Sequence, residues 1–464
     1  METKILDKNA EFFGVPAGQL MENAGKAVAN EAKKLPFKRW LVLCGPGNNG
    51  GDGYVTCCHI KNCKVIAVER PRTNLAIKNF RKAKTKCKIY NYNKENFINL
   101  LEKSDAIIDA MLGVGIKGKL GEPYREIVKI LNKSGKFILS VDVPTGFGSD
   151  LMLNSNLTVT FHFIKEDMNK KCGKIVVADI GIPEEAEKYV GPGELILYPR
   201  RRKESHKGEN GIVAIIGGGA YTGAPYLAGM AALRAGCDLV YVCCPSSVWS
   251  VVASFSPDLI VRKIGGEFLT VEGLKEAEDI IEKADAIVVG PGLGKRKEVL
   301  EACKFIFENY DKKFVYDADA IEILKGKKCN QKVIITPHSG EFKRLTGINL
   351  PDDIEERAKI VKKEAKKLDA TILAKGAIDI ISDGKRLKMN KIHNEGMTVG
   401  GTGDTLAGIC AAMLAKKIAP FYSACISAFI NGMAGNMAYE EKGNIVATDL
   451  IEKIPLVIKK FTQE

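Results

Sequence analysis

The sequence GGTGDTLAGICAAMLA spans residues 400–415 and decides how the second half of the chain folds. Its glycines precede a run of small and apolar residues that predicts a buried helix. Glycine lets the backbone approach a ligand closely, and the N–H groups at a helix start bind phosphate. Asp404 stands at the start of this helix. The stretch therefore predicts an anion hole beside a carboxylate, with a helix-capping role for Asp404 as the alternative.

Short strands are predicted before this helix, with helical patterns between them. Their apolar, β-branched runs cover residues 211–216, 239–243, 286–289, 314–316, 333–335 and 371–373. This alternation indicates βαβ units and a mostly parallel sheet. A polar, basic stretch at residues 198–211 comes just before the first strand and is typical of a domain boundary. We therefore expect two domains, residues 1–199 and 200–464.

The first half shows the same alternation around another glycine loop, GPGNNGGDG at residues 45–53. An amphipathic helical region is predicted over residues 5–35, and strands over 40–44, 64–68, 106–109, 137–141 and 157–161. The loop lacks the spacing of a Walker motif and of G-x-G-x-x-G. Its glycines and the following helix start favour a phosphate-bearing ligand. A tight turn capped by Asn and Asp side chains is an equal alternative.

Carboxylates stand at two further strand ends of the first half. Asp109 ends the strand of AIIDAMLGVGIKGK, and Asp142 ends that of FILSVDVPTG. Parallel sheets place ligands beyond the carboxyl ends of their strands, so these side chains are expected in one cleft. Oxygens of Asn49, Asp109 and Thr145 would form a hard site suited to K+, which leaves Asp142 for acid–base work. A helix-capping role is the alternative for any one aspartate.

Three other loops follow strands in the second half. They are GGGAYTGAP at residues 217–225, GPGLG at 290–294 and TPHSGEF at 336–342. The strand that follows GGGAYTGAP ends in Cys243-Cys244-Pro245 and lacks the acidic residue of a dinucleotide site, which argues against hydride transfer. His338 either binds substrate or is an ordinary turn residue, and the residues alone slightly favour the turn.

Composition limits the partners that the chain can have. No apolar run approaches the roughly 18–20 residues of a membrane helix, and the amino-terminal segment has no apolar core of a secretion signal. A cytoplasmic protein that does not bind membranes is expected. The net charge of +13 could indicate nucleic acid or anionic small molecules as partners. The lysines are spread out without interleaved aromatics, which favours a solvated surface and no nucleic acid.

The cysteines and histidines predict no metal centre. The thirteen cysteines include no C-x-x-C pair, and the five histidines form no spaced ligand cluster. Reduced thiols are therefore expected, and no structural zinc site is predicted.

Together these motifs resemble a known family over essentially the whole chain. LMENAG, GPGNNGGDG, IIDAMLGVG, VDVPTG and LTVTFHFIK follow the order of the YjeF N-terminal domain, an NAD(P)H-hydrate epimerase. SHKGENG, GGGAYTGAP, AALRAG, VVGPGLG, TPHSGEF, AKG and GMTVGGTGDTLAG resemble an ADP-dependent NAD(P)H-hydrate dehydratase. The resemblance implies an α/β chain, with a Rossmann-like α/β/α sandwich followed by a ribokinase-like α/β/α domain.

The resemblance also implies site residues. In the first domain the hydrate would be bound by Asn48, Asn49, Gly50, Gly51, Asp52, Gly113, Val114, Gly115, Ile116, Lys117, Gly118, Lys119 and the catalytic Asp142. K+ would be held by Asn49, Asp109 and Thr145. In the second domain the hydrate would lie near Ala224, Gly292, His338 and the catalytic Asp404. ADP would lie along Lys375, Gly376, Ala377, Ile378, Asp379, Asn394, Gly400, Gly401, Thr402 and Gly403.

The implied reaction repairs a hydrated nicotinamide ring. ADP or ATP, with Mg2+, would phosphorylate the ring hydroxyl, and loss of phosphate would restore the C=C bond. Only the S epimer would fit, so the first domain would interconvert R and S. A homo-oligomer is expected. Two alternatives stay open: a small-molecule kinase that stops at a phosphoester, and a first domain that only senses nucleotides.

The chain departs from the family pattern at three places. Thr145 stands where the family usually has Ser, and the hydroxyl is kept. The family's GTG loop reads Gly113-Val114-Gly115, and a commonly basic position is shifted to Lys117 or Lys119. The usual N-x-T-G-N reads NKIHN at residues 390–394, which bears on the adenine or ribose contacts and not on the reaction.

Overall fold

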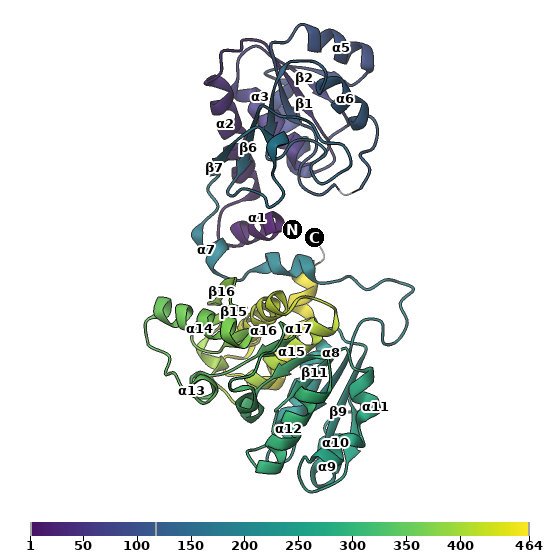
Figure 1. Ribbon diagram of the computed structural model, residues 1–464, viewed down its shortest axis with the longest axis vertical. Helices are drawn as coiled ribbons and strands as arrows, with labels where there is room; N and C mark the ends of the chain where they lie inside the picture. The colour runs from purple at the N-terminus through teal and green to yellow at the C-terminus, as the bar shows by residue number, and fades with distance from the viewer. Residues whose placement is uncertain (1, 117, 463–464) are drawn as a thin grey trace. The chain divides into compact units, whose positions relative to one another are not determined.

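The computed structural model describes residues 2–116 and 118–462, which fold as two compact units. One unit is residues 13–183, and the other joins residues 2–12 to residues 184–462 (Figure 1). This grouping differs from the boundary expected after residue 199. The helical region expected over residues 5–35 is two helices, α1 (Glu2–Phe12) and α2 (Ala17–Lys33). Gly14, with φ of +94°, and Pro16, at the N-cap of α2, break it.

The unit of residues 13–183 is built on a seven-stranded parallel sheet in the order β3-β2-β1-β4-β5-β6-β7. The strands are β1 (Trp40–Cys44), β2 (Cys63–Ala67), β3 (Lys88–Asn91), β4 (Ala106–Ala110), β5 (Phe137–Val141), β6 (Leu157–Phe161) and β7 (Lys174–Ala178). The other helices are α3 (Asn48–His59), α4 (Asn74–Lys84), α5 (Lys94–Glu102) and α6 (Tyr124–Leu131), with a 3-10 turn at Lys170–Cys172.

Side chains alternate between the two faces of this sheet. Leu41 and Leu43 join the core formed with α5 and α6, while Val42 and Cys44 face Gly53 of α3. The expected Rossmann-like α/β/α sandwich is therefore confirmed for this unit. The strands β3 and β7 are additional to those expected.

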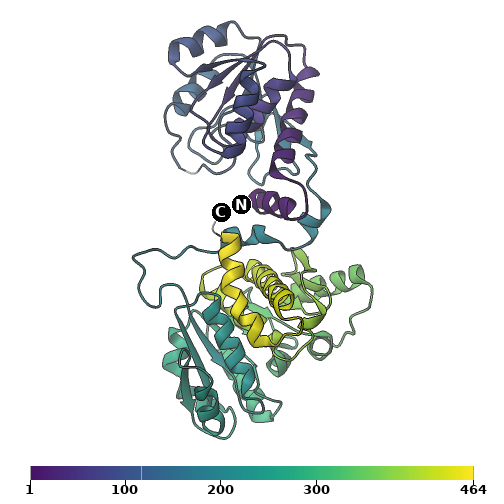
Figure 2. The ribbon, with the colours of Figure 1, turned by 180° about the vertical axis from the view of Figure 1, so that it is seen from behind.

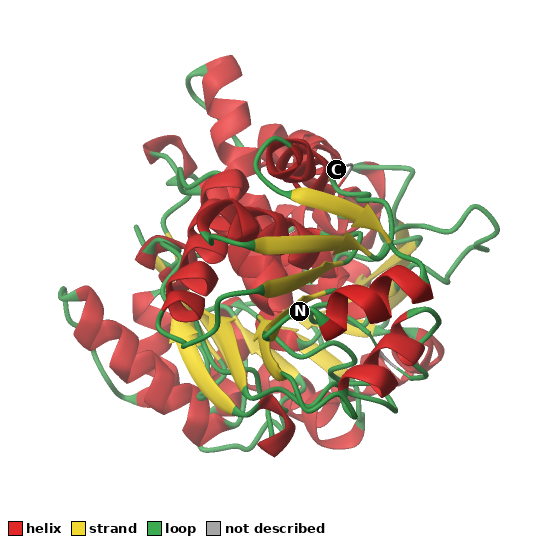
Figure 3. Cartoon of the chain, turned by 90° about the horizontal axis from the view of Figure 1, so that it is seen from above, coloured by secondary structure: helices red, strands yellow, loops and turns green. Residues whose placement is uncertain are grey.

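The other unit carries a nine-stranded sheet in the order β10-β9-β8-β11-β12-β13-β14-β15-β16, parallel up to β14 and antiparallel beyond it. The strands are β8 (Ile212–Ile216), β9 (Leu239–Pro245), β10 (Ile260–Ile264), β11 (Ala286–Val289), β12 (Lys313–Tyr316), β13 (Val333–Ile335), β14 (Thr371–Ala374), β15 (Asp379–Ser382) and β16 (Leu387–Asn390). Figure 3 distinguishes strands from the helices around them.

Helices cover both faces of the nine-stranded sheet, as expected for a ribokinase-like domain. One face packs on α8 (Gly223–Arg234), α15 (Thr402–Ala415), α16 (Pro420–Lys442) and α17 (Ala447–Thr462), of which the last two lie side by side (Figure 2). The other face packs mainly on α10 (Val271–Lys275), α11 (Glu278–Lys283), α12 (Lys297–Asn309), α13 (Ser339–Thr346) and α14 (Ile354–Leu368). The remaining elements are α7 (Glu184–Lys188), η2 (Pro192–Leu197), α9 (Ser246–Ser254), η3 (Ala318–Leu324) and η4 (Glu395–Met397).

The amino-terminal helix α1 is part of this second unit. Buried Asn9 donates from Nδ2 to Glu194 Oε2 (3.0 Å) and accepts at Oδ1 from the N–H of Gly193 (2.7 Å). The ring of Phe12 packs edge-on against Phe429 and Phe461. Helix α1 therefore completes a core whose other residues lie more than 180 positions later, at η2, α16 and α17.

No helix within the described residues is long and apolar enough to span a membrane.

Candidate active sites

Asp109 is the centre of a buried hydrogen-bond network in the unit of residues 13–183. It is the last residue but one of β4 and has no exposed surface. Thr145 donates to its carboxylate from both Oγ1 (2.6 Å, to Oδ1) and the backbone N–H (2.8 Å, to Oδ2). Ser140 Oγ and the N–H of Met111 donate as well. Burial raises the pKa of Asp109, and these hydrogen bonds partly oppose the shift.

Asn49 brings an uncommitted polar group close to this network. It lies in the first turn of α3, and its Nδ2 is buried without a hydrogen-bond partner among the described residues. A Cβ added to Gly113 would come within 3.5 Å of Asn49 Cβ, so the loop after Asp109 lies against Asn49. Buried amides are normally hydrogen-bonded, so this one is suited to a ligand or ion, with the oxygen and nitrogen positions of the amide interchangeable.

The glycine loop after β1 holds its predicted residues at the start of α3. The helix begins at Asn48, only three residues after β1, so the tight turn of the alternative is present. Its N-cap is Gly47, without a side-chain hydrogen bond, so no Asn or Asp side chain caps the helix there. A Cβ on Gly50 would lie 2.0 Å from the Gly45 carbonyl, so only glycine allows this approach. Gly51 and Asp52 follow in the same buried first turns.

Backbone contacts at Gly118 fix the second predicted loop, residues 113–119, to the segment of residues 149–150. The carbonyl of Gly118 accepts from the N–H of Asp150, and Gly118 forms a β-bridge with Ser149. Gly115 and Gly118 have φ values of +142° and +80°, which fit glycine. Val114 and Ile116 pack against apolar clusters, and Lys119 is exposed. Lys117 lies outside the described residues.

Asp142 forms an ion pair that the sequence interpretation missed. It follows β5 with φ of +62°, and its Oδ1 lies 2.8 Å from Nζ of Lys165. Lys165 is only 6% exposed and also donates to the Phe161 carbonyl and Thr160 Oγ1. The position of Lys165 at the end of LTVTFHFIK was the signal in the sequence that could have indicated this pair, since a lysine after a buried strand is unusual. Because its carboxylate pairs with Lys165, Asp142 does not cap a helix.

In the other unit, Lys375 and Asp317 form a buried pair at the ends of β14 and β12, the strands on either side of β13. Asp317 follows β12 and is 3% exposed, and its Oδ1 accepts from Lys375 Nζ (2.8 Å) and Thr336 Oγ1 (2.8 Å). Glu341 Oε2 lies 3.8 Å from the same amine. Burial alone would lower the pKa of Lys375, but Asp317 and Glu341 raise it. Asp317 and Glu341 were not among the predicted site residues.

Asp404 lies in the first turn of α15 next to this charge cluster. Burial and the carboxylate of Asp317 raise its pKa to about 7, against the lowering effect of Lys375. The N-cap of α15 is Gly401, with no side-chain cap, so the helix-capping alternative for Asp404 is wrong. A carboxyl group with a pKa near neutrality is suited to accept a proton at physiological pH.

The glycines before Asp404 form a tight helix start. Gly401 has φ of +96°, and a Cβ there would lie 2.5 Å from Leu227 Cδ1. A Cβ on Gly403 would lie 3.3 Å from Lys375 Nζ, so the lysine approaches the first turn directly. The Thr402 hydroxyl donates to the carbonyls of Met397 and Val399. The predicted anion hole therefore has an amine beside it.

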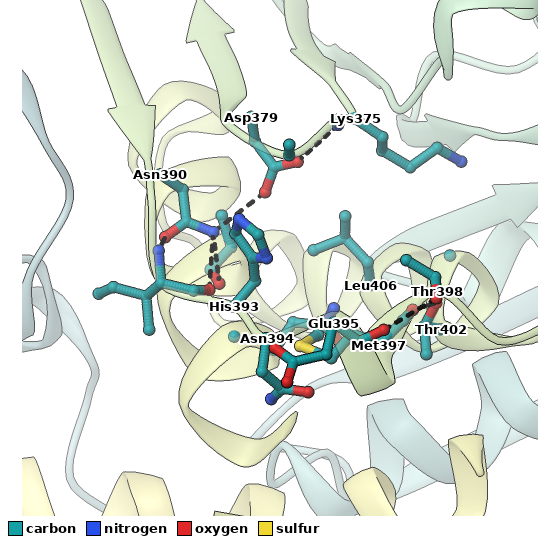
Figure 4. Close-up of a pocket in the computed structure, with 17 residues that line it drawn as sticks. Lys375, Asp379, Asn390, His393, Asn394, Glu395, Met397, Thr398, Thr402 and Leu406 are labelled. Carbon is teal, nitrogen blue, oxygen red and sulfur yellow. Dashed lines mark hydrogen bonds between the residues drawn. The ribbon is translucent and has the colours of Figure 1, made fainter. Parts of the chain in front are cut away.

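A cavity of about 280 Å³ opens beside this helix start (Figure 4). It brings together Lys375, Gly376, Ala377, Asp379, Asn394, Thr402 and Gly403 of the predicted nucleotide residues. Ile378, Gly400 and Gly401 are not in its lining. Asp379 is fixed by the N–H of Gly376 (3.0 Å) and Nδ2 of Asn390 (3.0 Å). Asn394 Oδ1 is buried and has no hydrogen-bond partner in the described part of the chain, as expected of a group reserved for a ligand.

The segment that departs from the family pattern lines the same cavity. Asn390, Ile392, His393 and Asn394 all face it, although the prediction named only Asn394 (Figure 4). Leu406, Ala428, Asn431 and Gly432, which the prediction did not name, also line the cavity. They come from the interior of α15 and α16, where only the folded packing shows which helix face meets the cavity.

The three remaining predicted substrate residues lie in separate segments, which follow β8, β11 and β13. Ala224 is in the first turn of α8. Gly292 has φ of +74°, and its carbonyl accepts from the N–H of Tyr221. His338 caps α13, where its Nδ1 accepts from the N–H of Gly340 (3.0 Å). Its Nε2 lies 3.3 Å from Glu341, and the side chain stays more than half exposed. His338 therefore has a turn role and still offers an accessible ring.

Two family profiles match the two halves of the chain. The family described as NAD(P)H-hydrate dehydratase matches residues 213–456, and the family described as YjeF-related protein N-terminus matches residues 17–166. A ribokinase-like superfamily protein from Enterococcus faecalis superposes with a TM-score of 0.53 at 26% identity, over 60% of this chain and 97% of its own. An ADP/ATP-dependent NAD(P)H-hydrate dehydratase from Bacillus subtilis, co-crystallised with ATP/Mg2+, gives 0.52 at 27% identity over 59% and 98%.

Relatives of full length extend the match across both halves. The bifunctional NAD(P)H-hydrate repair enzyme Nnr of Archaeoglobus fulgidus is 43% identical over 98% of this chain and 97% of its own. The enzyme of the same name from Pyrobaculum aerophilum is 40% identical over 100% and 98%. The chain therefore belongs to the family of bifunctional NAD(P)H-hydrate repair enzymes.

Proposed function

We propose that this enzyme interconverts the R and S epimers of hydrated NADH or NADPH and dehydrates the S epimer. Residues 13–183 would carry out the epimerisation. The larger unit would carry out the dehydration and convert ADP to AMP, or ATP to ADP, with release of phosphate. The observation that carries the proposal is Asp404, a carboxyl group with a pKa of about 7 beside Lys375 and a glycine-rich helix start.

In the dehydration, Asp404 would take the proton of the ring hydroxyl as this oxygen attacks the terminal phosphorus of the nucleotide. The O–P bond to the nucleotide breaks, and the N–H groups at the start of α15 and the Lys375 amine stabilise the transferred phosphoryl group. The ring C–O bond then breaks, phosphate leaves with the electron pair, and loss of a proton from the adjacent carbon restores C=C. Phosphorylation is needed because hydroxide is a poor leaving group.

The nucleotide would occupy the cavity beside α15, with its phosphates towards Gly403 and Lys375. The carboxylate of Asp379 and the unpaired Oδ1 of Asn394 would accept hydrogen bonds from ribose or adenine groups. Mg2+ would enter with the nucleotide and offset the phosphate charge. The carboxylates of Asp317, Glu341 and Asp404 around Lys375 are hard oxygen donors that fit such an ion.

In the epimerisation, Asp142 would transfer a proton of the substrate, and the ion pair with Lys165 would hold its carboxylate in place. K+ would be bound by Asn49, Asp109 and Thr145, whose hydroxyl and carboxylate oxygens already meet at 2.6 Å. The orphaned buried amide of Asn49 fits this role. The ion would order the glycine loop and the residue 113–119 loop around the substrate, which are the loops that flank Asn49.

The substrates are soluble nucleotides, so we place the enzyme in the cytoplasm with small-molecule partners only, without nucleic acid or membrane. We further propose a homo-oligomer, which light scattering on the purified protein would test.

The test is incubation of a mixed R and S hydrate with ADP, with ATP or without nucleotide. Absorbance of the reduced nicotinamide should return fully with nucleotide, whereas only epimer exchange should occur without it. A small-molecule kinase would instead leave a stable phosphoester and no recovered absorbance. A first unit that only senses nucleotides would leave the R epimer unconverted, and either result would overturn the proposal.

A further inference from the structure

Three cysteine thiols meet at the amino-terminal end of the seven-stranded sheet. The sulfur atoms of Cys57, Cys63 and Cys87 all lie within 4.8 Å of one another. Cys57 is in the last turns of α3, Cys63 begins β2, and Cys87 immediately precedes β3. Since Lys64 pairs with Lys88 in the parallel register, Cys63 and Cys87 are neighbours, with their sulfurs 3.4 Å apart. The fold thus gathers thiols that are distant in sequence.

The cluster is distinct from the candidate epimerase site. That site begins at Asn48, and Cys57 lies nine residues further along the same helix, about 13 Å at 1.5 Å per residue. Of the thirteen cysteines, all within the described ranges, only Cys58, Cys63 and Cys87 are partly exposed. The other cysteines are fully buried. The accessible thiols of the chain are therefore gathered at one point, where an ion from solvent can reach them.

Positive charge lies near the cluster. Cys58 follows Cys57 on the same helix and is half-buried, but its sulfur is not one of the three that lie within 4.8 Å of one another. Lys82 and Lys86 interact electrostatically with Cys58, and Lys86 also with Cys87, so the negative charge of several thiolates would be offset. Without an ion, Cys63 Sγ (3.4 Å) and Cys87 Sγ (3.1 Å) donate to the Cys57 carbonyl.

These distances fit tetrahedral sulfur coordination. A zinc–sulfur bond of about 2.3 Å puts the sulfurs of a tetrahedral site about 3.8 Å apart. The Cys63–Cys87 separation of 3.4 Å is slightly shorter than this value, and the other two separations are at most 4.8 Å. A disulfide needs about 2.05 Å, well below the 3.4 Å between Cys63 and Cys87. Thiolate ligands select Zn2+ among the divalent ions that prefer tetrahedral sites.

We propose that Cys57, Cys63 and Cys87 bind one Zn2+ ion, with a water molecule as its fourth ligand, and that the ion fastens the end of α3 to the starts of β2 and β3. Each thiol that binds releases one proton to solvent, and no electrons are transferred. The role is structural, because the ion would join three elements at a distance from the candidate epimerase site. It would anchor the far end of the helix whose first turn carries Asn48 and Asn49.

The test uses the full-length enzyme, stripped of metal with a chelator under reducing conditions. Zn2+ should then bind in a one-to-one ratio, measured by elemental analysis after desalting, and raise the unfolding temperature. Co2+ added in its place should give the intense visible and near-ultraviolet bands of tetrahedral thiolate coordination. Cys63→Ser and Cys87→Ser should each weaken Zn2+ binding at least tenfold and lose those bands.

Cys172→Ser is the matched control, because Cys172 belongs to the same unit but to a different apolar cluster. It should bind Zn2+ as the parent does. Cys58→Ser removes a partly exposed thiol outside the group of three and is a second control, which should also bind Zn2+ as the parent does. If the cluster variants do not fold, the Zn2+ stoichiometry and the Co2+ bands of the parent still decide. Stoichiometry and Co2+ bands unchanged in the cluster variants would overturn the proposal. A metal-free protein that forms only a Cys63–Cys87 disulfide, seen as a mass lower by two hydrogens, would overturn it as well.

Discussion

The proposed role of Asp404 follows from its burial. Its pKa is near 7 because solvent is excluded and because Asp317 lies near, while Lys375 limits the shift. A base must be ionised, so dehydration should fall about tenfold per pH unit below pH 7, and Asp404→Asn should abolish it. Epimer exchange should be unchanged in this variant. The pH–rate profile of kcat/KM for the S epimer, with exchange followed separately, measures both.

Asp317→Asn provides the control on the cause of this pKa. Without the Asp317 charge, the pKa of Asp404 should fall, so the acid limb of the profile should move to lower pH. If the acid limb does not move, it reports the titration of a group other than Asp404. Stability gives a second check: because the folded pKa of Asp404 is raised, its favourable contribution is present at low pH and is lost as pH rises towards 7. Asp404→Asn should therefore gain thermal stability relative to the parent as pH rises.

Substitutions at Thr145 test whether this residue binds a cation or only packs in the core. Thr145→Ser keeps the hydroxyl that meets Asp109, whereas Thr145→Val keeps the shape and removes it. If K+ is bound here, epimerase activity of the parent and of Thr145→Ser should rise with K+. Thr145→Val should lose at least tenfold activity and the response. A K+ titration of exchange rates decides, and an equal response in all three proteins would exclude the site.

Lys165 tests whether the buried pair with Asp142 serves catalysis or only stability. Lys165→Met removes the charge, and breaking such a pair costs about 3–5 kcal/mol because one charge is left buried. Adding Asp142→Asn should recover much of that stability without restoring epimer exchange. Dehydration of the S epimer should continue in both variants. Recovery of exchange in the double variant would show that neither group moves the proton.

At the scale of elements, the approach of α15 to α8 positions Asp404. A Cβ on Gly408 would lie 2.0 Å from the carbonyl of Ala228, so the helices meet at backbone contact. Gly408→Ala should separate them, cost about 1–3 kcal/mol of stability and slow dehydration. Gly18→Ala, whose Cβ would meet only Leu75 at 3.7 Å, is the control and should be neutral or stabilising. Calorimetry of both variants makes the comparison, and equal stability would contradict the close-contact account.

The elements that sequence predicts best are those that repeat a strong local signal. Strands β1, β4 and β6 are buried along their whole length, and the ends of β1 and β4 carry the glycines and the carboxylate that mark a ligand site. Strands β3, β7, β10, β15 and β16 were not anticipated, because these strands are short, mix polar with apolar residues and are partly exposed. Asp317 and Lys165 were missed because each acts through a partner 58 and 23 residues away, respectively, which no local spacing encodes.

At the scale of the whole molecule, the structure sets where the chain can be divided. Residues 13–183 contain a complete sheet and core and should fold alone and exchange the epimers without nucleotide. A fragment of residues 204–464 lacks both α1 and η2, so it should be less stable than a chain in which residues 1–12 are joined to 184–464 by a short linker. Calorimetry and S-epimer dehydration compare the two.

Asn9→Ala in the full chain is the companion measurement. It removes both hydrogen bonds that tie α1 to η2, so it should lower the unfolding temperature of the larger unit and leave epimer exchange intact. If the fragment of residues 204–464, the linked chain and the full-length enzyme were equally stable, α1 would contribute nothing to the stability of that unit. Sequence could not have placed α1, because an amphipathic helix shows that it packs on a core but not on which one.

The position of α1 also sets the order in which a nascent chain can acquire its two activities. The ribosome makes this helix before residues 13–183, yet its partners at Gly193, Glu194, Phe429 and Phe461 leave the ribosome only after those residues. Residues 13–183 are complete long before then and can close their own core. During translation the epimerase unit should thus become active before the dehydratase unit, whose core is complete only when Phe429 and Phe461 meet α1.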